Sequence, residues 1–271
     1  MKRGVLLFIL SFLFNTSVYS DSKVQVNYTV IPQAKGLSGK PNNYGYFSKK
    51  TEGGFHNIMA EIAKDTNIDA SFINYDDYYS ALTNTTIYSP MTNPEIMLGA
   101  TFSEEATKYL DYVSVPIFTD YLVLVVNNKF NEKDFKFSSD FPSDVKNIKS
   151  QVIGLKGFDI PYLKNKNIKQ FEYYKTVDLA LEEVFLNNKV FIVSKVLLDE
   201  YLEKNKDSEK IKSLNILEYK DFPIHYFFVI NKKSSLFLTK FDEDNFFTDI
   251  LFKKLQELID NDELLKIIEN K

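Results

Sequence analysis

The stretch IMLGATFSEEATKYLDY, residues 96–112, carries the most structural information in the sequence. Its first part, Ile96–Thr101, is apolar and β-prone, which predicts a buried strand. The polar run that follows predicts a helix beginning at Ser103, whose hydroxyl can cap the first turn. A junction between a strand end and a helix start presents backbone N–H groups on which a ligand can dock. The stretch therefore predicts one edge of a binding site.

The rest of the chain alternates between strand-like and helix-like runs. In residues 53–67 the apolar positions Phe55, Ile58, Met59, Ile62 and Ala63 share one helical face. Such alternation predicts an α/β fold with a mostly parallel sheet. Further strands are expected at 24–31, 70–75, 120–126, 152–157, 189–194, 215–220 and 225–231. Further helices are expected at 76–84, 141–148, 159–166, 176–188, 195–205 and, with an amphipathic pattern, 235–271.

The N-terminus has the pattern of a secretory signal peptide. Lys2 and Arg3 precede the apolar run Val5–Phe14, and the polar segment Asn15–Ser20 follows it. This pattern predicts a signal peptide over residues 1–20, cleaved near Ser20, and export to a periplasm. The apolar run is shorter than the ~20 residues that a membrane-spanning helix needs, although an uncleaved anchor helix stays an alternative.

The composition limits the possible partners. Without Lys2 and Arg3 the chain has 31 basic and 37 acidic residues, a net charge of −6, so nucleic acid is not an expected partner. Arg3 is the only arginine, and there is no cysteine. The exported chain would thus have no guanidinium fork for a carboxylate, no lipid-modified N-terminal cysteine and no disulfide. The 251 residues after the signal peptide suffice for one large domain or two smaller ones.

The order of the motifs resembles the type II periplasmic solute-binding proteins, in particular family 3, which serves amino-acid ABC transporters. The resemblance covers nearly the whole exported chain. It is carried by GGFHNIMAEIAKDTN (53–67), YDDYYSAL (75–82) and GATFSEEATKYLDY (99–112). It is supported by VIGLKG (152–157), TVDLALEEVFLNNKVFIVS (176–194) and HYFFVINKKSSLF (225–237).

This resemblance implies an architecture and a mode of action. It implies two lobes of a Venus-flytrap, residues 22–119 plus 226–271 and residues 120–225. Two hinge strands would join them near Thr119–Leu122 and His225–Phe228. A small-molecule solute would bind between the lobes, and the closed monomer would be read by the membrane permease of an ABC importer.

The resemblance also implies a set of ligand-binding residues. The aromatic residue that flanks the ligand falls on Tyr75, and the backbone and hydroxyl contacts fall on Gly99 and Thr101. On the second lobe the corresponding positions are Lys156, Ser194 and Lys195. Alternatives stay open: Tyr75 as a core or surface tyrosine, Gly99 and Thr101 as an ordinary strand end, and Lys195 as an exposed lysine at a helix start.

Both family anchors for an α-amino acid are replaced in this chain. The arginine that holds the carboxylate falls on Ala106, and the acidic residue that grips the ammonium falls on Lys195. Lys108 is predicted to point away from position 106 and to be solvated. Asp159, which follows the Lys156 loop, is interpreted as the N-cap of a helix rather than a ligand contact. The expected ligand is therefore a small anionic or neutral polar solute, and not a standard α-amino acid.

Catalysis is not expected. The only histidines, His56 and His225, lie far apart in the sequence, and no metal or cofactor motif accompanies them. The motifs H-E-x-x-H and G-x-S-x-G and the P-loop are absent. The alternative function is a ligand-sensing or degenerate binding protein that signals to a sensor kinase or a chemoreceptor.

Overall fold

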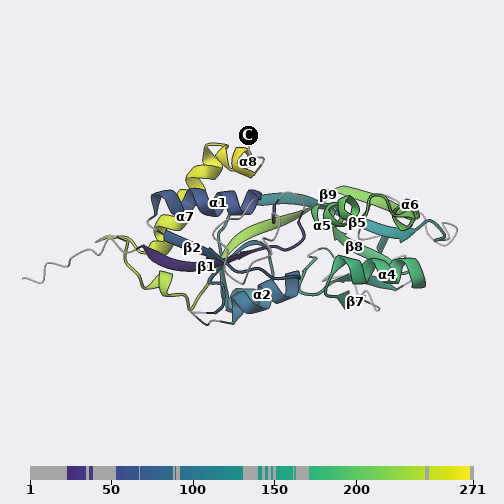
Figure 1. Ribbon diagram of the computed structural model, residues 1–271, viewed down its shortest axis with the longest axis horizontal. Helices are drawn as coiled ribbons and strands as arrows, with labels where there is room; N and C mark the ends of the chain where they lie inside the picture. Colours follow the sequence, from purple (N-terminus) through teal and green to yellow (C-terminus); the bar gives the residue numbers. More distant parts are fainter. Residues whose placement is uncertain are drawn as a thin grey trace, which may run out of the picture.

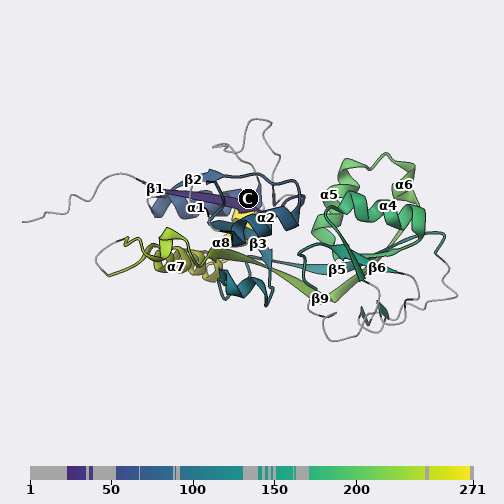
Figure 2. The ribbon, with the colours of Figure 1, turned by 90° about the horizontal axis from the view of Figure 1, so that it is seen from below.

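The computed structural model is an elongated α/β molecule with two groups of elements at opposite ends of its long axis (Figures 1 and 2). This confirms the expected two-lobed α/β architecture. The structure describes residues 23–34, 37–38, 53–66, 68–87, 89, 92–130, 140–141, 144–145, 148, 151–160, 162, 171–241 and 244–268. The expected signal peptide, residues 1–20, and most of the expected helices at 141–148 and 159–166 lie outside these residues.

The first lobe is built on parallel strands in the order β2-β1-β3. Helix α1 lies on one face of these strands and α2 on the other (Figure 1). The C-terminal helices α7 and α8 pack against α1. The bounds are β1 Val24–Val30, α1 Gly54–Asp65, β2 Ile68–Phe72, α2 Tyr78–Thr86, β3 Ile96–Thr101, α7 Phe247–Asp260 and α8 Glu263–Ile268.

Local sequence signals explain these helices. On α1 the predicted apolar residues Phe55, Ile58, Met59 and Ile62 are fully buried, so the amphipathic pattern forms the core face. Helix α2 begins after Asp77, whose carboxylate accepts a hydrogen bond of 2.8 Å from the amide of Ser80. Tyr78 is therefore the first residue of α2 and lies at a defined end of the helix.

The second lobe has parallel strands in the order β8-β6-β7, covered by α4 and α5. All five residues of β8 are buried, as its continuous apolar sequence predicts. Helix α4 begins after Thr176, which accepts a hydrogen bond from the amide of Leu179. The bounds are β6 Val152–Leu155, β7 Phe171–Tyr174, α4 Val177–Asn187, β8 Val190–Ser194, α5 Lys195–Lys204 and α6 Glu209–Lys212.

Two long strands, β5 (Phe118–Asn127) and β9 (Leu214–Asn231), run antiparallel and connect the lobes (Figure 2). β5 pairs with β8 from Leu122 onward, and β9 pairs with β3 from Tyr226 onward. Between these points Thr119–Tyr121 faces Pro223–His225, and in the described part of the chain no third strand pairs there. Among the named strands of the described residues, the parallel pairs lie within the lobes and the antiparallel pairs involve β5 or β9, so the sheet is mixed.

Several local expectations were wrong. The helix expected from Ser103 is a short 3-10 turn, η1 (Ala106–Lys108), followed by the strand β4 (Leu110–Tyr112), which pairs with β9. The two strands expected at 215–220 and 225–231 are one continuous strand, β9, because a bulge opposite Tyr121 and Leu122 absorbs the irregularity before Pro223.

The C-terminal tail is helical only in part, although one helix was expected over residues 235–271. It consists of a 3-10 turn, η4 (Ser235–Phe237), followed by the separate helices α7 and α8. Leu255, Leu258 and Leu264 are buried, whereas Leu265 is exposed. Among the described residues no helix is both long and apolar enough to span a bilayer.

Candidate functional site

The carboxyl end of β3 is closed by tyrosine hydroxyl groups. The amide of Thr101 donates to the phenol oxygen of Tyr78 at 2.9 Å, and the threonine Oγ1 lies 3.0 Å from the same oxygen. The hydroxyl of Tyr112 donates to the carbonyl of Thr101 at 3.2 Å. Thr101 is buried, so the hydrogen bonds that a ligand would make with it are already made within the chain.

The end of β8 in the second lobe is likewise closed by a tyrosine hydroxyl. Ser194 is fully buried, and its Oγ hydrogen-bonds the hydroxyl of Tyr226, which is also fully buried and comes from β9. Burial raises the pKa of Tyr226 well above the ordinary value for a phenol. The phenol therefore stays protonated and can serve Ser194 as donor or acceptor.

Asp120 replaces Ser194 as the capping group of α5. Ser194 is the N-cap residue of α5, but its side chain makes no capping bond. The carboxylate of Asp120, on β5 between the lobes, accepts a hydrogen bond of 2.7 Å from the amide of Val196. Burial raises the pKa of Asp120, and the bond from Val196 opposes that shift. The connecting strand is thereby bonded to the first turn of a helix in the second lobe.

Aromatic rings join the two strand ends. The ring of Phe158, in the loop after β6, lies edge-on to Tyr78 with 5.8 Å between ring centroids. Its centroid lies 6.4 Å from that of Tyr226. Tyr226 is also the register partner of Thr101 in the β3–β9 pair. Thr101 of the first lobe and Ser194 of the second are therefore connected through Tyr78, Phe158 and Tyr226.

Lys156 takes part in the same contact between the lobes. Its Nζ lies 4.1 Å from the centroid of the Tyr79 ring on α2, a cation–π geometry. The next residue, Gly157, has φ +78°, and a Cβ there would lie 3.3 Å from Cδ2 of Tyr79. The exposed side chain of Lys156 thus lies at the rim of the contact rather than inside it.

Lys195 lies at the start of α5, as the sequence predicts. Its ammonium forms an ion pair with Asp199 one turn later, and both side chains are partly exposed. Lys195 directly follows Ser194, the last residue of β8. The ion pair, however, partly neutralises the positive charge that Lys195 offers an anion.

Ala106 lies in η1 and is buried, with its amide 3.5 Å from Oγ of Ser103. A methyl group there gives no positive charge toward the end of β3. Lys108 is exposed, in agreement with its expected solvation. Asp159 lies close enough to Tyr78 and Tyr112 that its charge raises the pKa of both hydroxyls, although burial is the larger cause. Its expected capping role concerns a helix that falls outside the described residues.

Tyr75 and Gly99 are placed in the packing of the first lobe. Tyr75 follows β2, is half-buried and packs against the hydrophobic core. Gly99 has φ +94° at a register shift between β3 and β9. A Cβ there would lie 2.5 Å from Cγ2 of Ile31 and 2.7 Å from the ring of Phe55. The close approach that this glycine permits is therefore an approach of core side chains.

Neither histidine is arranged for catalysis. His56 is buried, with Nδ1 3.0 Å from the hydroxyl of Tyr28 and Nε2 3.0 Å from the carbonyl of Ser38. His225 is exposed on β9, and its Nδ1 lies 2.9 Å from Oγ1 of Thr119 on the opposite strand. In the part of the chain that the structure describes, no cluster of metal-ligating side chains could hold an ion.

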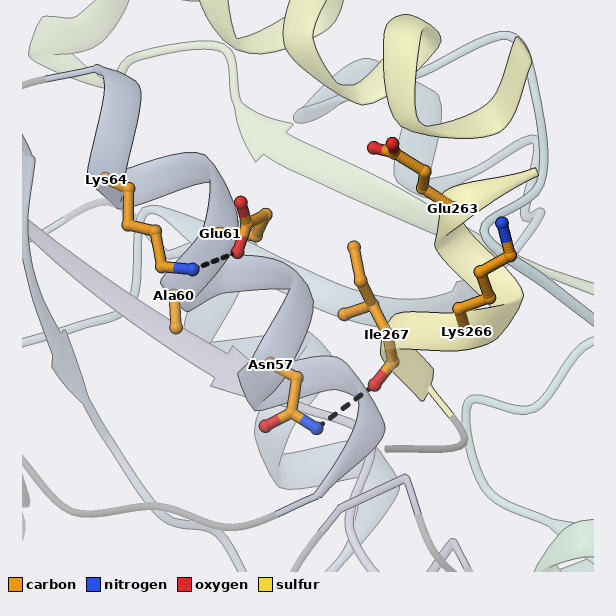
Figure 3. Close-up of a pocket in the computed structure, with 7 residues that line it drawn as sticks. All are labelled: Asn57, Ala60, Glu61, Lys64, Glu263, Lys266 and Ile267. Atoms are coloured by element: carbon orange, nitrogen blue, oxygen red, sulfur yellow. Dashed lines mark hydrogen bonds and ion pairs between the residues drawn. The ribbon is translucent and has the colours of Figure 1, made fainter. Parts of the chain in front are cut away.

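A surface pocket of about 540 Å³ lies between α1 and α8 (Figure 3). Asn57 donates to the carbonyl of Ile267 across it, and Lys64 pairs with Glu61 along α1 (Figure 3). None of the predicted site residues lines this pocket. Its lining residues are Asn57, Ala60, Glu61, Lys64, Glu263, Lys266 and Ile267.

Sequence reasoning did not assign roles to the side chains that complete the strand ends. Tyr112 and Tyr226 have no local signal beyond their positions in predicted strand or helix runs, and Phe158 lies in a loop. Tyr78 lies in the expected helix at 76–84, which by itself indicates no partner for its hydroxyl. Only its position as the first residue of a capped helix, directed at the next strand end, could have indicated its contact with Thr101.

Solved structures share this fold at low sequence identity. A substrate-binding protein of an amino acid ABC transporter has a TM-score of 0.62 and 14% identity, and the alignment covers 91% of this chain and 98% of that one. An ancestral arginine-binding protein bound to arginine has a TM-score of 0.62 and 15% identity, with 92% and 98% coverage. A histidine kinase sensor domain with similarity to periplasmic binding proteins has a TM-score of 0.62 and 14% identity, with 91% and 95% coverage.

No protein-family model and no curated protein sequence matches the chain. Identities near 15% show a shared fold and not a shared ligand. The alignments cover nearly the whole length of those neighbours. The chain therefore has the two-lobed fold of the type II periplasmic substrate-binding proteins.

Proposed function

We propose that the protein is an exported, non-catalytic, monomeric solute-binding protein that captures a small polar or anionic solute between its lobes. It would deliver this solute to the membrane permease of an ABC importer, and it would need no cofactor and no nucleic acid. The neighbouring structures are binding proteins and a sensor domain, which favours recognition over chemistry. The predicted signal peptide, residues 1–20, supports a periplasmic location.

One observation carries this proposal. The polar ends of β3 and β8, Thr101 and Ser194, come from different lobes and converge on Tyr226 and Phe158. In open α/β sheets ligands bind outside the carboxyl ends of strands, so this convergence is the expected position of a cleft. A solute there would contact both lobes and could stabilise their closed arrangement.

The two connecting strands support a proposal for the lobe boundaries. We propose that residues 22–119 plus 226–271 move as one lobe and residues 120–225 as the other. The bonded pair of Thr119 and His225 would lie at the hinge, where β5 and β9 pair with each other alone among the described strands. Bending there breaks the fewest interstrand bonds, which favours rotation at this point.

The solute class rests on the charged residues near the strand ends. Ala106 cannot hold a carboxylate, and Lys195 would repel an ammonium group. Both lysines belong to the second lobe: Lys156 lies over Tyr79 at the rim of the contact between the lobes, and Lys195 follows Ser194 at the end of β8. An anion bound between the strand ends could meet them there. We therefore propose an anion or a neutral polar solute as ligand, bound by Thr101, Lys156, Ser194 and Lys195, with Tyr75 and Gly99 shaping the first lobe.

A thermal-shift screen of the exported chain tests this function. Small carboxylates, phosphate, sulfate, neutral sugars and the standard amino acids would each be added at millimolar concentration. A ligand at 100 times its Kd stabilises a protein by about 2.7 kcal/mol, which raises the melting temperature measurably. We expect at least one anion or neutral solute to raise it, and Thr101→Val to reduce the shift. A screen in which no solute of any class has an effect would contradict solute binding.

The similarity to a histidine kinase sensor domain favours a second candidate, a signalling role. In that case the closed form would be read by a sensor kinase or a chemoreceptor rather than by a permease. The gene neighbourhood separates the two: an adjacent permease and ATPase favour import, and an adjacent sensor kinase favours signalling.

A further inference from the structure

The lobes contact each other through the first turn of α2 and the loop after β6. Tyr78 and Tyr79 come from α2, and Lys156, Gly157 and Phe158 come from the loop. The contact consists of the Tyr78–Phe158 ring pair, the ammonium of Lys156 over Tyr79, and the close approach of Gly157 to Tyr79. Gly157 and the buried Phe158 let the loop backbone lie directly against α2.

Tyr78 connects this contact to the end of β3. Because the amide of Thr101 can only donate, the phenol oxygen of Tyr78 accepts that bond, and it forms a second hydrogen bond with Oγ1 of the same residue, in which either hydroxyl can donate. The hydroxyl of Tyr78 thus bonds two polar groups of Thr101, while the ring of Tyr78 packs against Phe158 of the other lobe. Any movement of Phe158 away from Tyr78 removes packing from the side chain that holds Thr101.

Tyr226 binds the polar strand end of the second lobe, as Tyr78 binds that of the first. It comes from β9, pairs in register with Thr101, and hydrogen-bonds Ser194 at the end of β8. The Phe158 ring lies against both tyrosines. Thr101 and Ser194 are therefore bonded by the chain's own phenols, and a single phenylalanine ring lies between these phenols.

We propose that Tyr78, Phe158 and Tyr226 form an aromatic latch that by itself holds the lobes closed and competes with the solute for Thr101 and Ser194. The inference rests on the proposed function only in assuming that the solute binds between the lobes. Opening requires the Phe158 ring to leave both tyrosines, and a solute binds Thr101 only after the Tyr78 hydroxyl has moved. The apparent affinity for the solute is then lowered by the fraction of molecules in which the latch is closed.

The protonation of Tyr78 suits this role. Burial, with a smaller contribution from the charge of Asp159, raises the pKa of Tyr78 to about 12. The hydroxyl consequently keeps its proton at any physiological pH and can donate to Thr101. The latch should therefore be insensitive to pH in the neutral range.

Single-molecule FRET on the exported chain without added solute tests the latch. The sequence has no cysteine, so Ile87→Cys on the first lobe and Leu186→Cys on the second give unique labelling sites, and both side chains are exposed. We expect a high-transfer population in the otherwise wild-type protein and a shift to lower transfer in Phe158→Ala. The control Tyr109→Ala removes an exposed aromatic ring of the first lobe and should leave the distribution unchanged. Identical distributions for the wild type and Phe158→Ala would overturn the proposal.

A milder variant covers the case in which Phe158→Ala does not fold. Tyr78→Phe keeps the ring contact and removes only the hydroxyl, so the amide of Thr101 loses its partner. We expect hydrogen exchange of the Thr101 amide, followed by NMR, to become about tenfold faster or more. An unchanged exchange rate would overturn the role of Tyr78. Neither measurement uses a solute, so a negative solute screen leaves the latch intact, and an open unliganded protein refutes the latch without refuting solute binding.

Discussion

The phenol oxygen of Tyr78 lies 2.9 Å from the amide nitrogen of Thr101 and 3.0 Å from its Oγ1. A side chain at the first turn of α2 thereby completes the hydrogen bonding at the end of β3. The same side chain touches Phe158 of the other lobe. The polar end of the strand and the contact between the lobes are thus coupled through one residue.

Ser194 and Tyr226 should behave as a coupled pair in a double-mutant cycle. Both side chains are fully buried, so Ser194→Ala or Tyr226→Phe leaves one buried hydroxyl without its partner. Each single change should lower the free energy of unfolding by about 1–3 kcal/mol. The double variant should cost little more than one single change, which urea denaturation measures as a coupling energy.

The exposed pair of Tyr121 and Glu218 provides the matched control. Its hydroxyl–carboxylate distance is 3.2 Å, but both groups reach solvent. We expect a coupling energy below about 1 kcal/mol for Tyr121→Phe and Glu218→Gln. Equal coupling in the two cycles would contradict a special role for burial at Ser194.

Gly99→Ala should destabilise the first lobe more than Gly157→Ala destabilises the lobe contact. Both glycines have positive φ, so either alanine carries backbone strain of about 1–3 kcal/mol. At Gly99 the new methyl group also overlaps Ile31 and Phe55, which should add about 1–3 kcal/mol of overpacking. Thermal unfolding of the two variants compares them directly, and equal losses would show that the core adjusts at no cost.

His56 should make the protein sensitive to acid. Burial lowers the pKa of His56 to about 4 from 6.5, so the unfolded chain binds a proton at a pH where the folded chain does not. The contribution of neutral His56 to the free energy of unfolding is complete above pH 6.5. It is lost as the pH falls toward 4, at up to about 1.4 kcal/mol per pH unit. Urea denaturation at several pH values in this window should show a smaller loss in His56→Gln than in the wild type.

His225→Gln is the control for this pH dependence. His225 is exposed on β9, so its replacement should leave the acid-induced loss of stability as in the wild type. If His56→Gln and the wild type lost stability in parallel between pH 6.5 and 4, another group would be responsible.

The sequence predicts the elements whose signals are local. β3 begins and ends at the predicted residues, and the buried face of α1 is the predicted one, because period and burial decide both. The irregular segments were predicted less well. Residues 103–112 have helix-favouring composition, yet pairing with β9 draws Leu110–Tyr112 into the sheet.

The same limit applies to the candidate site. Thr101, Ser194 and Lys195 could be placed at strand ends or a helix start from the sequence, since strand ends follow from local pattern. Their partners Tyr78 and Tyr226 are distant in sequence, and only the tertiary structure brings them together. The ion pair of Lys195 with Asp199 has the i,i+4 spacing of the predicted helix, and the structure shows that the pair forms.

The most direct measurement is a calorimetric titration of the exported chain with two sets of solutes. One set contains glutamine, histidine and lysine, and the other contains small carboxylates, phosphate and neutral sugars. The account predicts micromolar binding from the second set alone, abolished by Lys195→Glu and unchanged by Lys108→Glu, since Lys108 is an exposed lysine at the end of η1. Micromolar binding of glutamine, histidine or lysine would contradict it.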